Sequence, residues 1–117
     1  MANDILLVGL DPHLVPGVDA AMVDMAIAMG QKRFEAAGIT ADQCLVKPDA
    51  SATAQIADAL VKKPYKVIVI GGGLRKPDEM VELFETTIDL VRRHAPNAAI
   101  AFNTNPMTSL DAALRWL

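Results

Sequence analysis

The stretch KVIVIGGGLRKPDEM, residues 66–80, decides the fold. It contains four consecutive β-branched residues, 67–70, which lose rotamer freedom in a helix and suit a strand that is covered on both faces. Three glycines follow, and Pro77 then stands where the first turn of a helix is expected. A buried strand that leads through a short turn into a helix is typical of one unit of a parallel α/β sheet.

The same alternation of strand and helix extends through the chain. We expect strands at 4–9, 43–46, 66–70 and 98–102, and helices at 19–37, 51–62, 77–94 and 108–117. Asp19 is expected to cap the first helix and Gly38 to end it. Because right-handed crossovers leave few strand orders, we predict an α/β three-layer sandwich whose four-stranded parallel sheet has the flavodoxin-like order 2-1-3-4. This order puts the two most apolar strands at the centre, and one domain is expected to span residues 1–117.

The composition argues against several classes of protein. Of the 117 residues 52% are apolar, yet the uninterrupted apolar runs are far shorter than the roughly 20 residues that cross a bilayer. The N-terminus lacks the basic segment of a secretory signal, so we expect a cytoplasmic protein without a membrane partner. A net charge of -3 argues against nucleic-acid binding. One cysteine and two histidines are too few for a structural zinc site, and we expect no metal or other cofactor.

The three glycines, 71–73, invite comparison with nucleotide-binding turns. The dinucleotide fingerprint needs a further glycine where this chain has Lys76, and it normally follows the first strand of the sheet. The spacing of a Walker A loop is also missing. Pro77 removes a donor N–H, and the two acids that follow it put negative charge where a phosphate would bind. A dinucleotide is therefore the least favoured ligand.

Two other interpretations of this turn stay open. In the first, the glycines only let the chain turn sharply at a crowded strand end, while Arg75 and Lys76 are solvated or pair with Asp78 and Glu79. In the second, the N–H groups of the glycines and the Arg75 guanidinium contact a small molecule. The two differ in whether the turn faces a cleft.

A cleft is expected where the winding direction of the sheet reverses, outside the carboxyl ends of the first and third strands. Asp11 and His13 follow the first strand, where they either act as an acid and a base or form an Asp-Pro turn with an exposed imidazole. Asn103 follows the last strand, as a further ligand contact or an ordinary turn residue. The expected ligand-binding residues are Leu10, Asp11, His13, Gly72, Gly73, Leu74, Arg75 and Asn103.

The C-terminal half carries a resemblance to known proteins. The segments VIVIGGGLRKP (67–77), LFETTIDLVRRHAPNAAIAFNTNP (83–106) and ALRWL (113–117) are similar to those of a family of short stand-alone α/β proteins of uncharacterised function, which we associate with bacteria and fungi. The resemblance implies a flavodoxin-like or Rossmann-like fold and a free-standing chain. It implies no activity, so no catalytic residue is carried over.

The helix at 19–37 has more apolar surface than one sheet-facing side requires. Met22, Met25 and Met29 form a second apolar flank at the spacing i, i+3, i+7. Such a flank either packs on an adjacent helix or meets a second copy of the chain, and Trp116 offers a further contact near the C-terminus. We expect a homodimer, with Met22, Met25, Met29 and Trp116 as its candidate interface.

Two classes of function follow. One is a small-molecule-binding or regulatory module with its pocket in the expected cleft. The other is a small enzyme in which Asp11 or His13 is the general base and Arg75 stabilises an anionic substrate or intermediate. The sequence holds no complete catalytic constellation, which favours the binding module. Cys44 lies inside an expected strand, where an inert buried thiol is favoured over a nucleophile.

Overall fold

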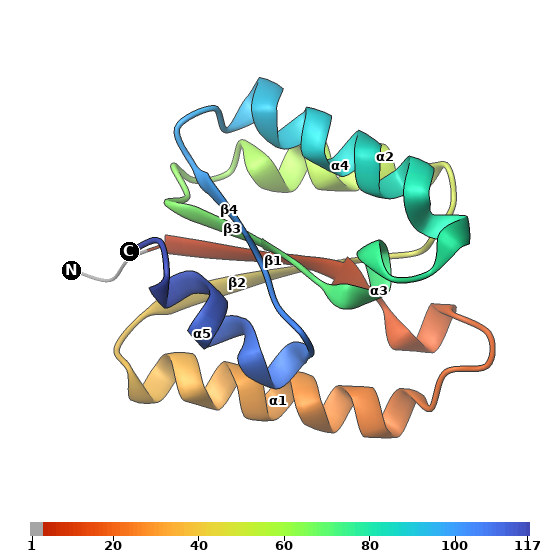
Figure 1. The fold of residues 1–117 in the computed structure, drawn as a ribbon, viewed down its shortest axis with the longest axis horizontal. Helices are drawn as coiled ribbons and strands as arrows, with labels where there is room; N and C mark the ends of the chain where they lie inside the picture. The colour runs from red at the N-terminus through yellow and green to blue at the C-terminus, as the bar shows by residue number, and fades with distance from the viewer. Residues whose placement is uncertain (1–3) are drawn as a thin grey trace.

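A parallel sheet forms the middle layer of the protein, as seen in a computed structural model that describes residues 4–117. Its strands are β1 (Asp4–Leu10), β2 (Thr40–Val46), β3 (Val67–Ile70) and β4 (Ala99–Phe102), in the order β2-β1-β3-β4. In Figure 1, helices α2 (Ser51–Leu60) and α4 (Val81–His94) cover one face, and α1 (Ala20–Ala36) and α5 (Ser109–Leu114) cover the other. The predicted three-layer sandwich and its strand order 2-1-3-4 are confirmed.

The two central strands are the most deeply buried, as their apolar character predicts. All four residues of β3 are at most 1% exposed. Ile5 of β1 pairs with Val67 of β3, which in turn pairs with Ala99 of β4, so these three residues lie in one row across the sheet. Because side chains alternate along a strand, successive residues of β3 point in turn into the α2–α4 layer and the α1–α5 layer. Within residues 4–117, no helix combines the length and the apolar character needed to cross a membrane.

The ends of α1 follow local signals in the sequence. Asp19 accepts a hydrogen bond from the backbone N–H of Met22 at 3.2 Å, as an N-cap does. Gly38 lies two residues beyond the helix with a φ of 70°, a left-handed conformation that glycine adopts without steric cost. The predicted cap and stop of this helix are confirmed.

Short helical turns replace parts of the predicted turns and helices. The glycine turn continues into a one-turn helix, α3 (Gly72–Arg75), where only a turn was expected. The prediction that the next helix begins at Pro77 is wrong: Pro77 is extended, the 3-10 turn η2 (Asp78–Met80) follows, and α4 starts at Val81. Two further 3-10 turns, η1 (Pro12–Leu14) and η3 (Pro106–Thr108), follow the ends of β1 and β4.

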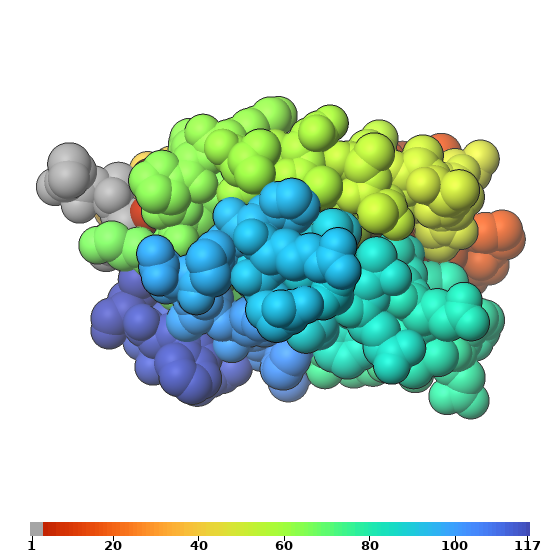
Figure 2. Space-filling view, turned by 90° about the horizontal axis from the view of Figure 1, so that it is seen from above, coloured from red at the N-terminus to blue at the C-terminus, as the bar shows by residue number. Residues whose placement is uncertain are grey.

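The layer of α2 and α4 is filled by large aliphatic side chains. Figure 2 looks onto this layer, and α2 (yellow-green) and α4 (teal to blue) lie side by side across it. The opposite layer is filled by residues of the sheet, α1 and α5, namely Ile5, Phe34, Ala41, Val67, Val69, Ala101, Leu110, Ala112 and Ala113. A cavity lies in this second layer.

Candidate functional site

A cavity of about 450 Å³ lies between α1 and the sheet, at the carboxyl ends of β1 and β3. Leu7, Gly9 and Val69 line it from the strands, and Val23 and Ile27 line it from α1. Its volume falls within the roughly 300–1,000 Å³ that is usual for small-molecule sites. The cavity is located where the winding direction of the sheet reverses, which is where the sequence predicts a cleft.

Two glycines explain the shape of this cavity. Gly9 occupies a strand position that faces α1 and carries no side chain to fill the space beneath the helix. Gly30 lets η3 approach α1 closely, because a Cβ on Gly30 would lie 2.3 Å from the carbonyl oxygen of Pro106. The helix is thus held near η3 while the space between its first half and the strand ends stays open.

The segment that follows β1 forms one wall. Pro12, Val15 and Val18 line the cavity from this segment. The imidazole Nε2 of His13 lies 2.5 Å from Asp24 Oδ2 on α1, which ties the segment to the helix.

Asp11 and His13 do not form the acid–base arrangement that the sequence suggests. The carboxylate of Asp11 accepts a hydrogen bond at 2.9 Å from the backbone N–H of His13 and thereby caps η1. The imidazole of His13 instead faces Asp24, and more than half of its surface is exposed. Neither Asp11 nor His13 is among the residues that line the cavity.

Asn103 fastens the glycine turn to the start of α5. Its Oδ1 accepts a hydrogen bond from the backbone N–H of Gly72 at 3.2 Å, and its Nδ2 donates to Ser109 Oγ at 2.9 Å. The hydroxyl of Ser109 donates in turn to the carbonyl oxygen of Pro106 at 3.0 Å. Asn103 is only 7% exposed, and both the oxygen and the nitrogen of its amide already have hydrogen-bond partners within the protein, as buried polar groups usually do.

Arg75 is oriented away from the cavity. Its guanidinium carbon lies 5.1 Å from the ring centroid of Phe102, and Nη2 donates to the carbonyl oxygen of Asn103. Its Nε is buried without a hydrogen-bond partner among the described residues. Leu74 is fully buried in the layer of α2 and α4. The interpretation in which Arg75 pairs with Asp78 or Glu79 is not what the structure shows.

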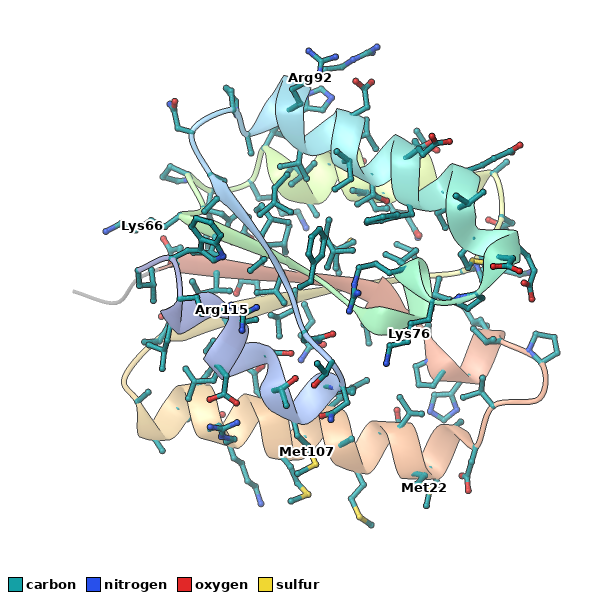
Figure 3. The ribbon with its side chains drawn as sticks, in the orientation of Figure 1. Met22, Lys66, Lys76, Arg92, Met107 and Arg115 are labelled. Carbon is teal, nitrogen blue, oxygen red and sulfur yellow. The ribbon has the colours of Figure 1, made fainter. Side chains whose placement is uncertain are left out.

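Lys76 also lines the cavity, although from the sequence it was expected only to be solvated or to pair with acids. Its Nζ donates to the carbonyl oxygen of Thr104 at 3.0 Å, and Figure 3 shows the side chain extending from α3 toward the segment after β4. The turn of α3 brings Lys76 back over Gly72, because its backbone N–H donates to the carbonyl oxygen of Gly72 at 2.9 Å. Only a prediction of this one-turn helix would have placed Lys76 at the cavity.

The eight predicted ligand-binding residues divide into two groups. Four of them line the cavity, namely Leu10, Gly72, Gly73 and Asn103. The other four, Asp11, His13, Leu74 and Arg75, lie next to it in the chain without lining it. Val23 and Ile27 stand at the spacing i, i+4 that puts both side chains on the sheet-facing side of α1, but they were not among the predicted cleft residues.

Other chemically active groups in the chain lie elsewhere. The Cys44 thiol is partly buried on the side of α2, 3.9 Å from the carbonyl oxygen of Gln55, and burial raises its pKa. A thiol with a raised pKa is a poor nucleophile, in keeping with the expected inert role. Residues 4–117 contain no group of three or more His, Cys, Asp or Glu side chains that could hold a metal ion.

No protein-family model matches the chain, and no curated protein matches it either. The family resemblance of residues 67–77, 83–106 and 113–117 therefore stays an expectation.

Proposed function

We propose that the protein is a small-molecule-binding or regulatory module whose ligand occupies the cavity between α1 and the sheet. The observation that carries this proposal is a cavity of about 450 Å³ with a mainly aliphatic wall at the switch point of a parallel sheet. The wall includes Leu7, Val15, Val23, Ile27, Leu45 and Val69. A ligand with a largely apolar body fits such a wall, because the removal of apolar surface from water on binding stabilises the complex.

The polar groups around the cavity support an apolar rather than a polar ligand. Asn103 and Ser109 use their side-chain groups for each other and for the backbone. Gln43 donates to Gln31 Oε1 at 3.3 Å. A sugar or nucleotide would have to break these bonds or leave its own polar groups without partners, which costs about 1–3 kcal/mol for each group.

The enzyme alternative receives less support from the geometry. It assigns the acid–base role to Asp11 or His13 and anion stabilisation to Arg75. None of these three residues lines the cavity. Asp24 holds the His13 imidazole, and Phe102 and the backbone hold the Arg75 guanidinium. Binding without chemistry is therefore the function we propose.

A neutral fluorescent probe tests ligand binding. We expect N-phenyl-1-naphthylamine to bind the wild-type protein with an increase in fluorescence. Val23→Phe puts a phenyl ring into the cavity and should weaken this binding by about tenfold or more. Val61→Phe is the matched control, because Val61 is 62% exposed just after α2 and does not line the cavity. The proposal is wrong if the wild type does not bind the probe, or if both variants bind it as the wild type does.

We further propose that the module is a homodimer that covers the methionine flank of α1. Met22, Met25 and Met29 are 70%, 66% and 46% exposed, so no neighbouring helix of the described chain covers them. Figure 3 shows Met22 and Met107 on the side of α1 and η3 that faces away from the sheet, and Met107 is also exposed. Flexible methionine side chains adapt well to a partner surface. Trp116, 58% exposed near the C-terminus, is the other candidate contact.

Light scattering tests the dimer. We expect a wild-type mass of two chains, and we expect Met25→Glu to give one chain because a charge would be buried in the interface. Val61→Glu, which changes another exposed apolar residue, should leave the dimer intact. A monomeric wild type would contradict the dimer and would leave the ligand-binding proposal unaffected.

A further inference from the structure

Among the described residues that line the cavity, Lys76 alone carries a charge. Its ammonium group has three donors, and one of them bonds to the carbonyl oxygen of Thr104. The ion pairs of residues 4–117 do not include Lys76, so no carboxylate of the described chain neutralises it. Two donors and a positive charge therefore remain at the edge of an otherwise apolar site.

The position of this ammonium group is set by Gly72. The Cε and Cδ atoms of Lys76 lie 3.3 Å and 3.5 Å from the position that a Cβ on Gly72 would take. The end of the Lys76 side chain thus lies against Gly72, and its Nζ donates to the carbonyl oxygen of Thr104. A side chain held at both points presents its charge to the cavity with less loss of rotamer entropy on binding.

Two further cations surround the same segment of backbone. The carbonyl oxygens of Phe102, Asn103 and Thr104 follow one another in the chain, and each accepts a hydrogen bond from a cation. The donors are Arg115 at 2.9 Å, Arg75, and Lys76 at 3.0 Å, and Figure 3 labels Lys76 and Arg115 on either side of this segment. None of the three forms an ion pair with a carboxylate of the described chain. Three cations therefore lie along this end of β4, and Arg115 also interacts electrostatically with Asp111.

We infer that the ligand is an amphiphilic anion: an apolar body between α1 and the sheet, and one anionic head group, such as a carboxylate, at Lys76 Nζ. This inference rests on the proposed binding function and names the chemical class of its ligand. A single ammonium group suits a head with a single charge. A head with many hydroxyls would meet side chains such as Asn103 and Ser109, whose polar atoms already have partners.

Octanoate and octan-1-ol form a matched pair of ligands for the test, since they share one chain and differ in the charge of the head. Each is titrated against protein loaded with N-phenyl-1-naphthylamine at neutral pH, and displacement of this neutral probe gives its dissociation constant. We expect the wild type to bind octanoate about tenfold more tightly than octan-1-ol. This preference should fall as salt is added, because ions screen an exposed charge.

Three variants separate the charge of Lys76 from its bulk. Lys76→Met keeps an unbranched apolar stem without the charge, and it should remove the preference for octanoate while the alcohol and the probe still bind. Lys76→Arg keeps the charge and should keep most of the preference. Lys32→Met removes an exposed cation of α1 that does not line the cavity, and it should change nothing.

The outcomes distinguish this inference from the proposed function. If the probe and octan-1-ol bind but octanoate has no advantage, or if Lys76→Met keeps that advantage, the amphiphilic anion is wrong and the apolar binding site stands. If neither the probe nor either ligand binds, both proposals are wrong.

Discussion

The two layers that cover the sheet differ in how closely they pack against it. On the side of α2 and α4, large aliphatic residues from the sheet and from α2 and α3 are at most 1% exposed, namely Leu6, Val8, Ile56, Leu60, Ile68, Ile70 and Leu74. On the other side, α1 contributes only Gly30 and Phe34 as buried residues along its described length. The first layer is a filled core, and the second encloses the cavity.

The layer of α1 and α5 adds polar and backbone contacts to its buried apolar cluster. Arg33 of α1 donates to both carboxylate oxygens of Asp111 at 3.0 Å and to the carbonyl oxygen of Met107 at 2.7 Å. These bonds fix α1 relative to η3 and α5 without putting side chains between the helix and the strand ends. One face of the sheet thus carries a filled core, while the other face borders a cavity.

The largest expected effect comes from making the same substitution on both sides. Ile56→Ala removes a fully buried side chain of α2 and should lower the free energy of unfolding by about 3 kcal/mol. Ile27→Ala, at the cavity wall of α1, should cost less than about 1.5 kcal/mol because that side chain is only partly buried and already borders empty space. Urea unfolding of both variants measures the difference. Equal losses would contradict the contrast between a filled and an open layer.

A second test concerns the close contact between α1 and η3 at Gly30, beside the open part of the cavity. Gly30→Ala should destabilise by about 2 kcal/mol, because its Cβ would lie 2.3 Å from a backbone oxygen of Pro106 that cannot move without η3. Gly73→Ala is the matched control: its Cβ would lie 3.7 Å from Leu10 Cδ1, an ordinary contact, and alanine favours the helix of α3. Thermal unfolding of the two variants decides the point, and a harmless Gly30→Ala would show that η3 does not hold α1.

The fold was predictable because its signals are local. Four β-branched residues in 67–70 and the regular spacing of strands and helices are enough to predict the layers and, with the handedness of crossovers, the strand order. Asp19 and Gly38 act on their own helix end, so the sequence alone identifies their roles.

The site was less predictable because its residues contact residues that are distant in the sequence. His13 binds Asp24 rather than the nearer Asp11, and Arg75 and Asn103 meet across 28 positions. The orientation of the Lys76 side chain depends on α3, and a one-turn helix is too short to be predicted from a periodic pattern. Sequence position put the cleft at the correct strand ends, while the tertiary contacts decided which side chains face it.

A third test addresses the hydrogen bonds by which Asn103 connects Gly72 to Ser109 beside the cavity. Asn103→Ala leaves the N–H of Gly72 without its acceptor and Ser109 without the amide donor, which should cost about 1–2 kcal/mol. Asn105→Ala is the control in the same segment: the exposed Asn105 side chain caps η3 and accepts from the N–H of Met107, and because water can replace an exposed acceptor its loss should cost less. Urea unfolding compares the two. Binding of the neutral probe should also weaken for Asn103→Ala, because the glycine turn lines the cavity.

The smallest effect, and the one with a distinct pH dependence, concerns the polar end of the filled layer. Hydrogen bonding from Lys63 at 2.9 Å, and then from the Tyr65 hydroxyl at 2.8 Å, holds the pKa of Asp42 below its usual value of 3.8. The ionised carboxylate thus adds stability above about pH 4, and this contribution is lost as the pH falls through the lowered pKa. Since the Asp42 side chain is 37% exposed, solvent screens the pair, and Asp42→Asn should cost less than about 1 kcal/mol at pH 7.

The same variant should lose its effect in acid. Unfolding free energies of wild type and Asp42→Asn are expected to converge between about pH 5 and pH 2, because the wild-type carboxyl is then protonated and resembles the amide in charge. Asp58→Asn is the control at pH 7, where it should have little effect, since Asp58 is an exposed residue of α2 without an ion pair in the described chain. An Asp42→Asn penalty that stays constant across this range would mean that the carboxylate stabilises the packed layer by shape and not by charge.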